Sequence, residues 1–164
     1  APLVKDPMWQ VRLEATRALG KCGAGSDIAL EALGALAEDW REEVVEEMLQ
    51  SLVRTAARRG HPGAIETAAS LLERREARIQ NAAIAALPQL AGLGDSTLLV
   101  AVAKRLAHEL RSVREAAIRA LSGLGPNVTE AVAGLFLHPN GHMRRAVLQA
   151  LGALDDRGAV EVIG

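Results

Sequence analysis

Small and apolar residues recur along this chain at the spacing of one buried helix face. Counting from Val11, they stand at offsets 0, +4, +7, +8 and +11, which share one side of a helix with 3.6 residues per turn. The pattern restarts at Val44, Ile79, Val113 and Met143, and the residue eight positions after each start is leucine in all five copies. The spacing predicts five copies of one helix, over residues 9–23, 42–57, 76–91, 111–124 and 142–154.

The intervals between these copies carry the start signals of a further helix. Each opens with a polar residue or a proline before an Ala/Leu-rich run. Such residues favour a helix start, because a polar side chain can accept a hydrogen bond from one of the unpaired N–H groups of the first turn, and proline has no N–H to leave unpaired. A glycine stands just before each start, where it can relieve the backbone at the end of the preceding helix. The starts are Ser26, His61, Asp95 and Pro126, and the glycines are Gly25, Gly60, Gly94 and Gly125.

These paired helices predict an all-α fold, an α-solenoid of about five stacked helical hairpins that forms a single domain over residues 1–164. Hydrophobic residues make up 49% of the chain and aromatic residues only 2%, so Ala, Leu, Val and Ile must fill the core. Residues 1–7 read as the tail of a first helix, and residues 157–164 as the head of another. Neither end shows a polar capping repeat, so we expect the chain to be a part of a longer array.

Charge and cysteine content argue against several classes of partner. The net charge is −1, which gives no global field for nucleic acid or an anionic membrane. One cysteine cannot form an internal disulfide, and no apolar run approaches the roughly 20 residues of a membrane span. The N-terminus shows no signal peptide pattern. We therefore expect an intracellular, cytoplasmic protein.

The residues around the first helix copy resemble the short form of the HEAT repeat, in which a D-P turn precedes V-R-x-x-A-x-x-A-L-G. Asp6-Pro7, Val11-Arg12 and Ala18-Leu19-Gly20 follow this form almost completely, and residues 113–121 and 139–152 follow it in part. Phycobilin lyases share this short repeat. The resemblance covers essentially the whole chain and implies a gently superhelical HEAT-like array.

The resemblance also implies a ladder between the turn Asp of one repeat and the helix Arg of another. Asp39 fits the Asp column, but Arg74 and His108 replace it further along. Val45 and Gln80 stand where the Arg is expected. We therefore predict that the ladder is interrupted in the middle of the chain.

Four other residues have interpretations that the structure can test. Pro88 lies inside the third helix copy and should kink or shorten it. Cys22 shares a column with leucines and is expected to be a packing residue rather than a nucleophile. Trp9 and Trp40 can be anchors for a partner, or rings that close the end of a hairpin core, which we favour.

The exposed columns of the second helices suggest the function. These columns lie at −1, +2 and +6 from each start, and none of them carries charge of a single sign. Along the chain, residues 38–47 are acidic, whereas the fourth and fifth repeats are basic. In arrays of this kind the second helices line the concave face, and a concave face with this charge gradient suits a protein partner of mixed charge. Scattered charges on a solvated face would give the same pattern. We predict a non-catalytic protein-protein interaction scaffold or adaptor, which binds a protein partner or belongs to a larger multi-protein assembly. Its candidate binding residues are Arg17, Glu46, Glu47, Gln50, Arg78, Asn81, Glu115, Arg119, Arg145 and Gln149, with Trp40 at the rim.

The alternative is a HEAT-like enzyme or chromophore lyase whose site lies partly outside this segment. HEAT-like iron hydroxylases use several His-Glu pairs, whereas this chain has the single pair His108-Glu109. No phosphate loop, zinc spacing or nucleophile elbow occurs in the sequence. We therefore predict no enzymatic activity, no cofactor, no metal, no nucleic acid and no small-molecule substrate.

Overall fold

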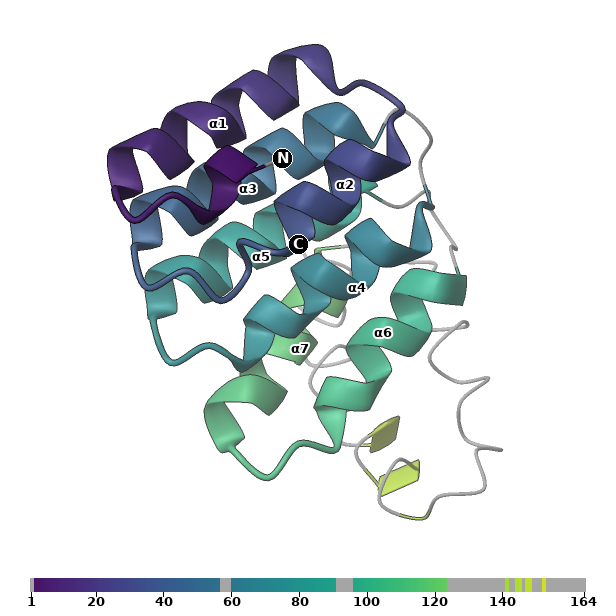
Figure 1. Ribbon diagram of the computed structural model, residues 1–164. Helices are drawn as coiled ribbons and strands as arrows, with labels where there is room; N and C mark the ends of the chain where they lie inside the picture. Colours follow the sequence, from purple (N-terminus) through teal and green to yellow (C-terminus); the bar gives the residue numbers. More distant parts are fainter. Residues whose placement is uncertain are drawn as a thin grey trace, which may run out of the picture.

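The computed structural model describes residues 2–56, 60–90, 96–123, 141, 144–145, 147–148 and 152. Within these residues all regular structure is helical, and the helices stack as repeats. Figure 1 shows α1, α3, α5 and α7 side by side in one layer, and α2, α4 and α6 in a second layer. The predicted all-α solenoid is therefore confirmed. The helices are α1 (Trp9–Cys22), α2 (Asp27–Gly34), α3 (Glu42–Thr55), α4 (Pro62–Ser70), α5 (Ala77–Leu90), α6 (Ser96–Leu106) and α7 (Arg111–Ser122), with 3-10 helices η1 (Pro2–Lys5) and η2 (Leu71–Glu73).

The predicted helix positions agree with the structure wherever it describes them. Helices α1, α3, α5 and α7 match the first four predicted copies to within two residues at each end. Of the fifth copy, residues 144–145, 147–148 and 152 are described and are helical. None of the helices that the structure describes is long and apolar enough to cross a membrane.

Local capping explains where the first helices begin. The Ser26 hydroxyl accepts the Ala29 N–H at 3.3 Å, and Nδ1 of His61 accepts the Ala64 N–H at 3.2 Å. Gly25 and Gly60 have φ of 72° and 87°, a left-handed conformation that glycine adopts without strain. The predicted starts at Asp95 and Pro126, and the glycines Gly94 and Gly125, lie outside the described residues.

The core lies between the two layers and is built from the predicted columns. Leu52, Leu87 and Leu121 of the leucine column are completely buried, whereas Leu19 is half-buried. Leu151, the fifth member, lies outside the described residues. Each fully buried leucine contributes about 1.5–3 kcal/mol relative to an exposed one, so this column is a major source of stability.

The predicted packing role of Cys22 is wrong, and Pro88 does not shorten its helix. Cys22 is exposed rather than packed, and it lines an open groove between α1 and α2. Pro88 does not shorten α5, which spans 14 residues as α1 and α3 do. Pro88 stands in the last turn of the helix, and the helical hydrogen bond that it removes is the one from its own position to the carbonyl oxygen of Ile84.

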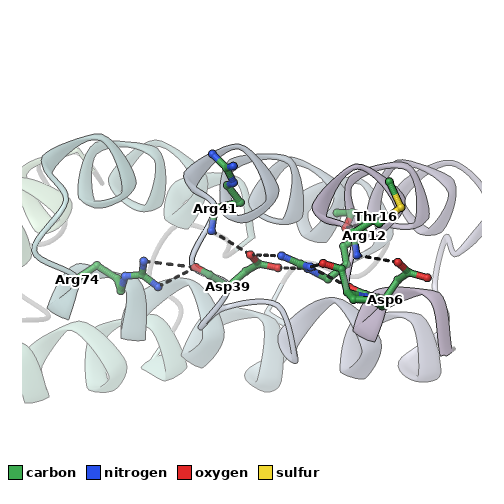
Figure 2. Close-up of polar contacts among 8 residues, drawn as sticks. Asp6, Arg12, Thr16, Asp39, Arg41 and Arg74 are labelled. Carbon is green, nitrogen blue, oxygen red and sulfur yellow. Dashed lines mark hydrogen bonds and ion pairs between the residues drawn. The ribbon is translucent and has the colours of Figure 1, made fainter.

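A buried ion pair joins the first two turns (Figure 2). Arg12 donates to both carboxylate oxygens of Asp39, with Nε–Oδ2 at 2.6 Å and Nη2–Oδ1 at 2.9 Å, and the two side chains are 9% and 4% exposed. Arg12 also donates to the carbonyl oxygen of Asp6 at 2.8 Å. Burial raises the pKa of the Asp39 carboxyl, but hydrogen bonds from Arg12 and from the Arg41 N–H outweigh it and hold that pKa below its ordinary value.

Carbonyl acceptors replace the carboxylate in the later turns. Arg74 donates to the carbonyl oxygen of Ala37 at 3.1 Å and to that of Asp39 at 3.4 Å, so it ties the third turn to the second (Figure 2). Gln80 donates to the carbonyl oxygens of its own turn, and Arg114 does the same in the fourth repeat. The predicted interruption of the Asp–Arg ladder is confirmed in the described residues.

We predict that Asp39→Ala lowers the free energy of unfolding by about 3–5 kcal/mol, because it leaves the buried Arg12 guanidinium without its carboxylate. Urea denaturation at pH 7 measures this loss. The difference from wild type should shrink below about pH 4, since the stabilisation is lost as pH falls through the depressed pKa of Asp39. Glu115→Ala, which breaks the exposed pair with Arg111, is the control and should cost no more than about 0.5 kcal/mol.

We also predict that Gly20→Ala destabilises the chain, although alanine favours a helix over glycine. A Cβ on Gly20 would lie 2.7 Å from Cβ and 3.0 Å from Cα of Ser51, so α1 and α3 would have to separate. Thermal and urea denaturation should show a loss of about 1–3 kcal/mol. Gly123→Ala is the matched control, because its Cβ would make only ordinary contacts at 3.5 Å; an equal loss in both variants would contradict the close approach.

Candidate protein-docking face

The predicted binding residues lie on the exposed side of the layer that α1, α3, α5 and α7 form. We call this surface the second-helix face. Its described members are exposed, except for Glu46 and Glu47, which are half-buried. Arg145 is also exposed, in a short described stretch beyond α7, and Gln149 lies outside the described residues. The members on the four helices are Arg17, Glu46, Glu47, Gln50, Arg78, Asn81, Glu115 and Arg119.

Polar pairs cross each junction between neighbouring helices of this face. From α1 to α3, Nε of Arg17 lies 3.5 Å from Oε2 of Glu47. From α3 to α5, Nε of Arg78 lies 2.5 Å from Oε1 of Glu46. From α5 to α7, Nη1 of Arg119 donates to Oδ1 of Asn81 at 2.9 Å. Six of the predicted residues are thus brought together in pairs, which the sequence analysis did not foresee.

Glu47 is the most connected carboxylate of the face. It accepts hydrogen bonds from Arg17, from Arg54 at 2.5 Å and from the Ser51 hydroxyl at 3.3 Å. Hydrogen bonding to Glu14, followed by the bond to Glu47, raises the pKa of Arg17 against the opposing effect of desolvation. Exposed pairs of this kind add little stability individually, but they fix long side chains in defined positions.

A groove of about 500 Å³ opens between α3 and α5 on the same face. It exists because α5 presents alanines there, so the space between the two helices is not filled. Glu46 and Gln50 of the predicted set line it, whereas Arg54 and Gln89 were missed. The only sequence signal for this groove is Ala85, the one small residue in the +6 column, which otherwise carries Arg or Gln. Its apolar lining comes from Leu49, Val53, Ala82, Ala85 and Ala86, and its polar lining from Glu46, Gln50, Arg54 and Gln89.

The two tryptophans have different environments at the turn end of the first repeats. Trp9 is partly buried and packs against the core, as predicted. Trp40 is 66% exposed, so the prediction that its ring closes a hairpin core is wrong. The Arg41 guanidinium lies 4.4 Å from the Trp40 ring centroid and 5.1 Å from that of Trp9, and this cation–π contact holds the exposed ring on the surface.

The single His-Glu pair is part of a turn. Nδ1 of His108 accepts a hydrogen bond from the Leu110 N–H at 3.1 Å. Nη1 of Arg114 donates hydrogen bonds to the carbonyl oxygens of His108 and Glu109. In the part of the chain that the structure describes, no three His, Cys, Asp or Glu side chains gather where they could hold a metal ion.

Comparisons with known proteins give distant structural similarity. No family model matches the chain, and no curated protein matches it. A designed armadillo repeat protein in complex with the peptide (KR)4 is 19% identical, with 93% of this chain and 79% of that chain covered and a TM-score of 0.48. An engineered protein is 21% identical, with 94% and 78% covered and a TM-score of 0.49. A computationally designed armadillo repeat protein for modular peptide recognition is 19% identical, with 92% and 79% covered and a TM-score of 0.45. The order and stacking of its own helices define this chain as an all-α helical repeat solenoid.

We predict that charge reversal on the second-helix face leaves the fold intact. Arg119→Glu removes one exposed hydrogen bond, so the free energy of unfolding should change by less than about 1 kcal/mol in urea denaturation. Leu87→Asp is the contrast, because it places an unpaired charge at a completely buried position and should cost more than about 4 kcal/mol. Equal melting of the Leu87→Asp variant and wild type would show that the assigned register is wrong.

Proposed function

We propose that this chain is a non-catalytic scaffold that docks another protein on the second-helix face. One observation carries the proposal: polar side chains of α1, α3, α5 and α7 are paired across the helix junctions, and a groove of about 500 Å³ lies between α3 and α5 on the same face. A surface held in this way loses little side-chain entropy when a partner binds. The groove supplies apolar contact area, and the paired side chains of the face supply orientation.

The charge layout indicates what the partner must offer. The first turns of α3 carry Glu42, Glu43, Glu46 and Glu47, whereas α7 carries Arg111, Arg114 and Arg119. A partner with a basic region facing α3 and an acidic region facing α7 would complement both, and such complementarity fixes register and raises the association rate. Trp40, exposed and stacked on Arg41, adds an aromatic anchor at the rim.

The proposal also includes the repeat type and the setting. The repeats are of the short HEAT type, supported by the D-P turn and by the Arg12–Asp39 pair that joins one repeat to the next. The protein is cytoplasmic and acts without enzymatic activity, cofactor or nucleic acid, which the single cysteine and the net charge of −1 support.

The test is affinity capture from the native source with variants of the face. Ala85→Arg fills the groove at an exposed position. The exchange Glu46→Arg/Arg78→Glu keeps the ion pair and reverses its direction. We expect wild type to retain one stoichiometric protein, and each variant to retain at least about ten-fold less, since 1.4 kcal/mol of lost contact corresponds to that factor.

The matched control is Val100→Arg, which adds the same charge at an exposed position of α6 in the other layer and should leave capture unchanged. Capture that persists in both face variants would contradict the docking face. Recovery of the chain alone with bound metal or an absorbing chromophore, measured by elemental analysis and absorbance, would favour the HEAT-like enzyme or lyase.

A further inference from the structure

The groove between α3 and α5 lies inside the array. Helix α1 packs beside α3, and α7 packs beside α5, so described helices flank the groove on both sides (Figure 1). The space exists because Ala82 and Ala85 of α5 stand in the columns in which α3 carries Glu47 and Gln50. The groove is therefore a property of the repeats themselves.

Both walls of the groove are single faces of a helix. Each wall has the i, i+3, i+4, i+7 spacing of one helix face, over about two turns. Arg78, in the first turn of α5, pairs with Glu46 near the start of α3, so the two helices begin at the same end and the walls run parallel. The wall positions are 46, 49, 50 and 53 on α3, and 82, 85, 86 and 89 on α5.

Opposite charges stand at the two ends of the groove. Glu46 lies towards the start of α3, and Arg54 lies in its last turn, about 12 Å further along the helix axis. Both carboxylate oxygens of Glu46 contact Arg78, and each can accept a second hydrogen bond. Nη2 of Arg54 contacts Glu47 at 2.5 Å and the Ser51 hydroxyl at 2.8 Å. Within the described residues Nε and Nη1 of Arg54 have no such partner, so they can donate to a carboxylate of another protein.

The apolar floor favours a helical segment over an extended one. Leu49 and Ala86 are 2% and 5% exposed, whereas the polar lining residues Gln50 and Gln89 are exposed. An extended segment laid over the floor would bury backbone N–H and C=O groups without partners, but a helix pairs its own. The groove therefore suits the apolar face of an amphipathic helix.

We propose that the groove between α3 and α5 binds an amphipathic helix of a partner protein, antiparallel to both, with an acidic side chain on Arg54 and a basic side chain on Glu46. The inference rests on the proposed docking function and names the element that docks. Antiparallel packing sets the positive N-terminal end of the partner helix beside the C-terminal ends of α3 and α5. Acidic residues early in a helix and basic residues late in it are also favourable. The acid therefore precedes the base in the partner by about eight residues, with apolar residues between them.

The probe is a labelled synthetic peptide that a side-chain staple on its solvent face holds helical, so that binding costs little folding entropy. It carries a glutamate near its N-terminus and a lysine about eight residues later, with leucines between them on the same face. The matched control has the same composition with the glutamate and the lysine exchanged. Fluorescence anisotropy should show saturable binding of the first peptide to the whole chain, and at least about ten-fold weaker binding of the second.

Variants of the chain locate the site and its polarity. Ala85→Arg fills the groove and should weaken binding of the first peptide at least about ten-fold. Val100→Arg adds the same charge to α6 in the other layer and should leave this affinity unchanged. Glu46→Gln and Arg54→Gln each remove one end charge, so each should reduce the preference between the two peptides by about three-fold. Thermal unfolding checks that every variant stays folded.

Failure of this inference is distinguishable from failure of the docking function. Capture of a protein that is lost with Ala85→Arg, together with no binding of either peptide, would overturn the helix and keep the docking face. Equal binding of the two charge arrangements would overturn the orientation. Equal binding of an unstapled peptide with a central proline would assign the groove to an extended segment. Dimers in sedimentation velocity that Ala85→Arg abolishes would assign it to a second copy of this chain.

Discussion

The stability of this chain depends on contact between successive repeats, because no hairpin can bury its Ala/Leu face alone. The close packing of α1 on α3 illustrates the constraint: Gly20 lies so near Ser51 that no Cβ fits between them. Short side chains on one helix allow the next to approach, and the leucine column behind them then loses its contact with water. Burial in one repeat is thus conditional on the presence of the next, as in other one-dimensional arrays.

Close approach at the helices leaves polar backbone at the turns, and buried guanidinium groups satisfy it. Arg12 bonds a carboxylate of the next turn and carbonyl oxygens of its own, whereas Arg74 reaches back to the carbonyl oxygens of the turn before. Arg105 links α6 to Glu73 in the same way at 2.9 Å. A guanidinium offers five donors in one plane, so it can serve several acceptors at once. Each bridge helps to fix the offset between repeats and therefore the positions of the predicted binding residues.

The same stacking produces two surfaces of different chemistry. Where helices of one layer are neighbours, their outward side chains meet as polar pairs and frame a shallow groove beside the alanines of α5. Between α1 and α2 the described residues form an open groove of about 420 Å³ with a mostly apolar lining. The first surface is the one on which we propose that a partner docks, chosen by charge and shape.

The fold class, the helix positions and the face on which Arg78 or Arg119 lies follow from the sequence alone, because helical periodicity is a local property of the chain. The interruption of the Asp–Arg ladder follows in the same way, since the residues are absent from their columns. The packing of the helices was needed to show that Arg17 meets Glu47 and that Arg119 meets Asn81. Those pairs join different columns, and their meeting depends on the offset between neighbouring helices. The packing likewise decided that Cys22 and Trp40 are exposed, because a column tells which way a side chain points and not whether another helix covers it.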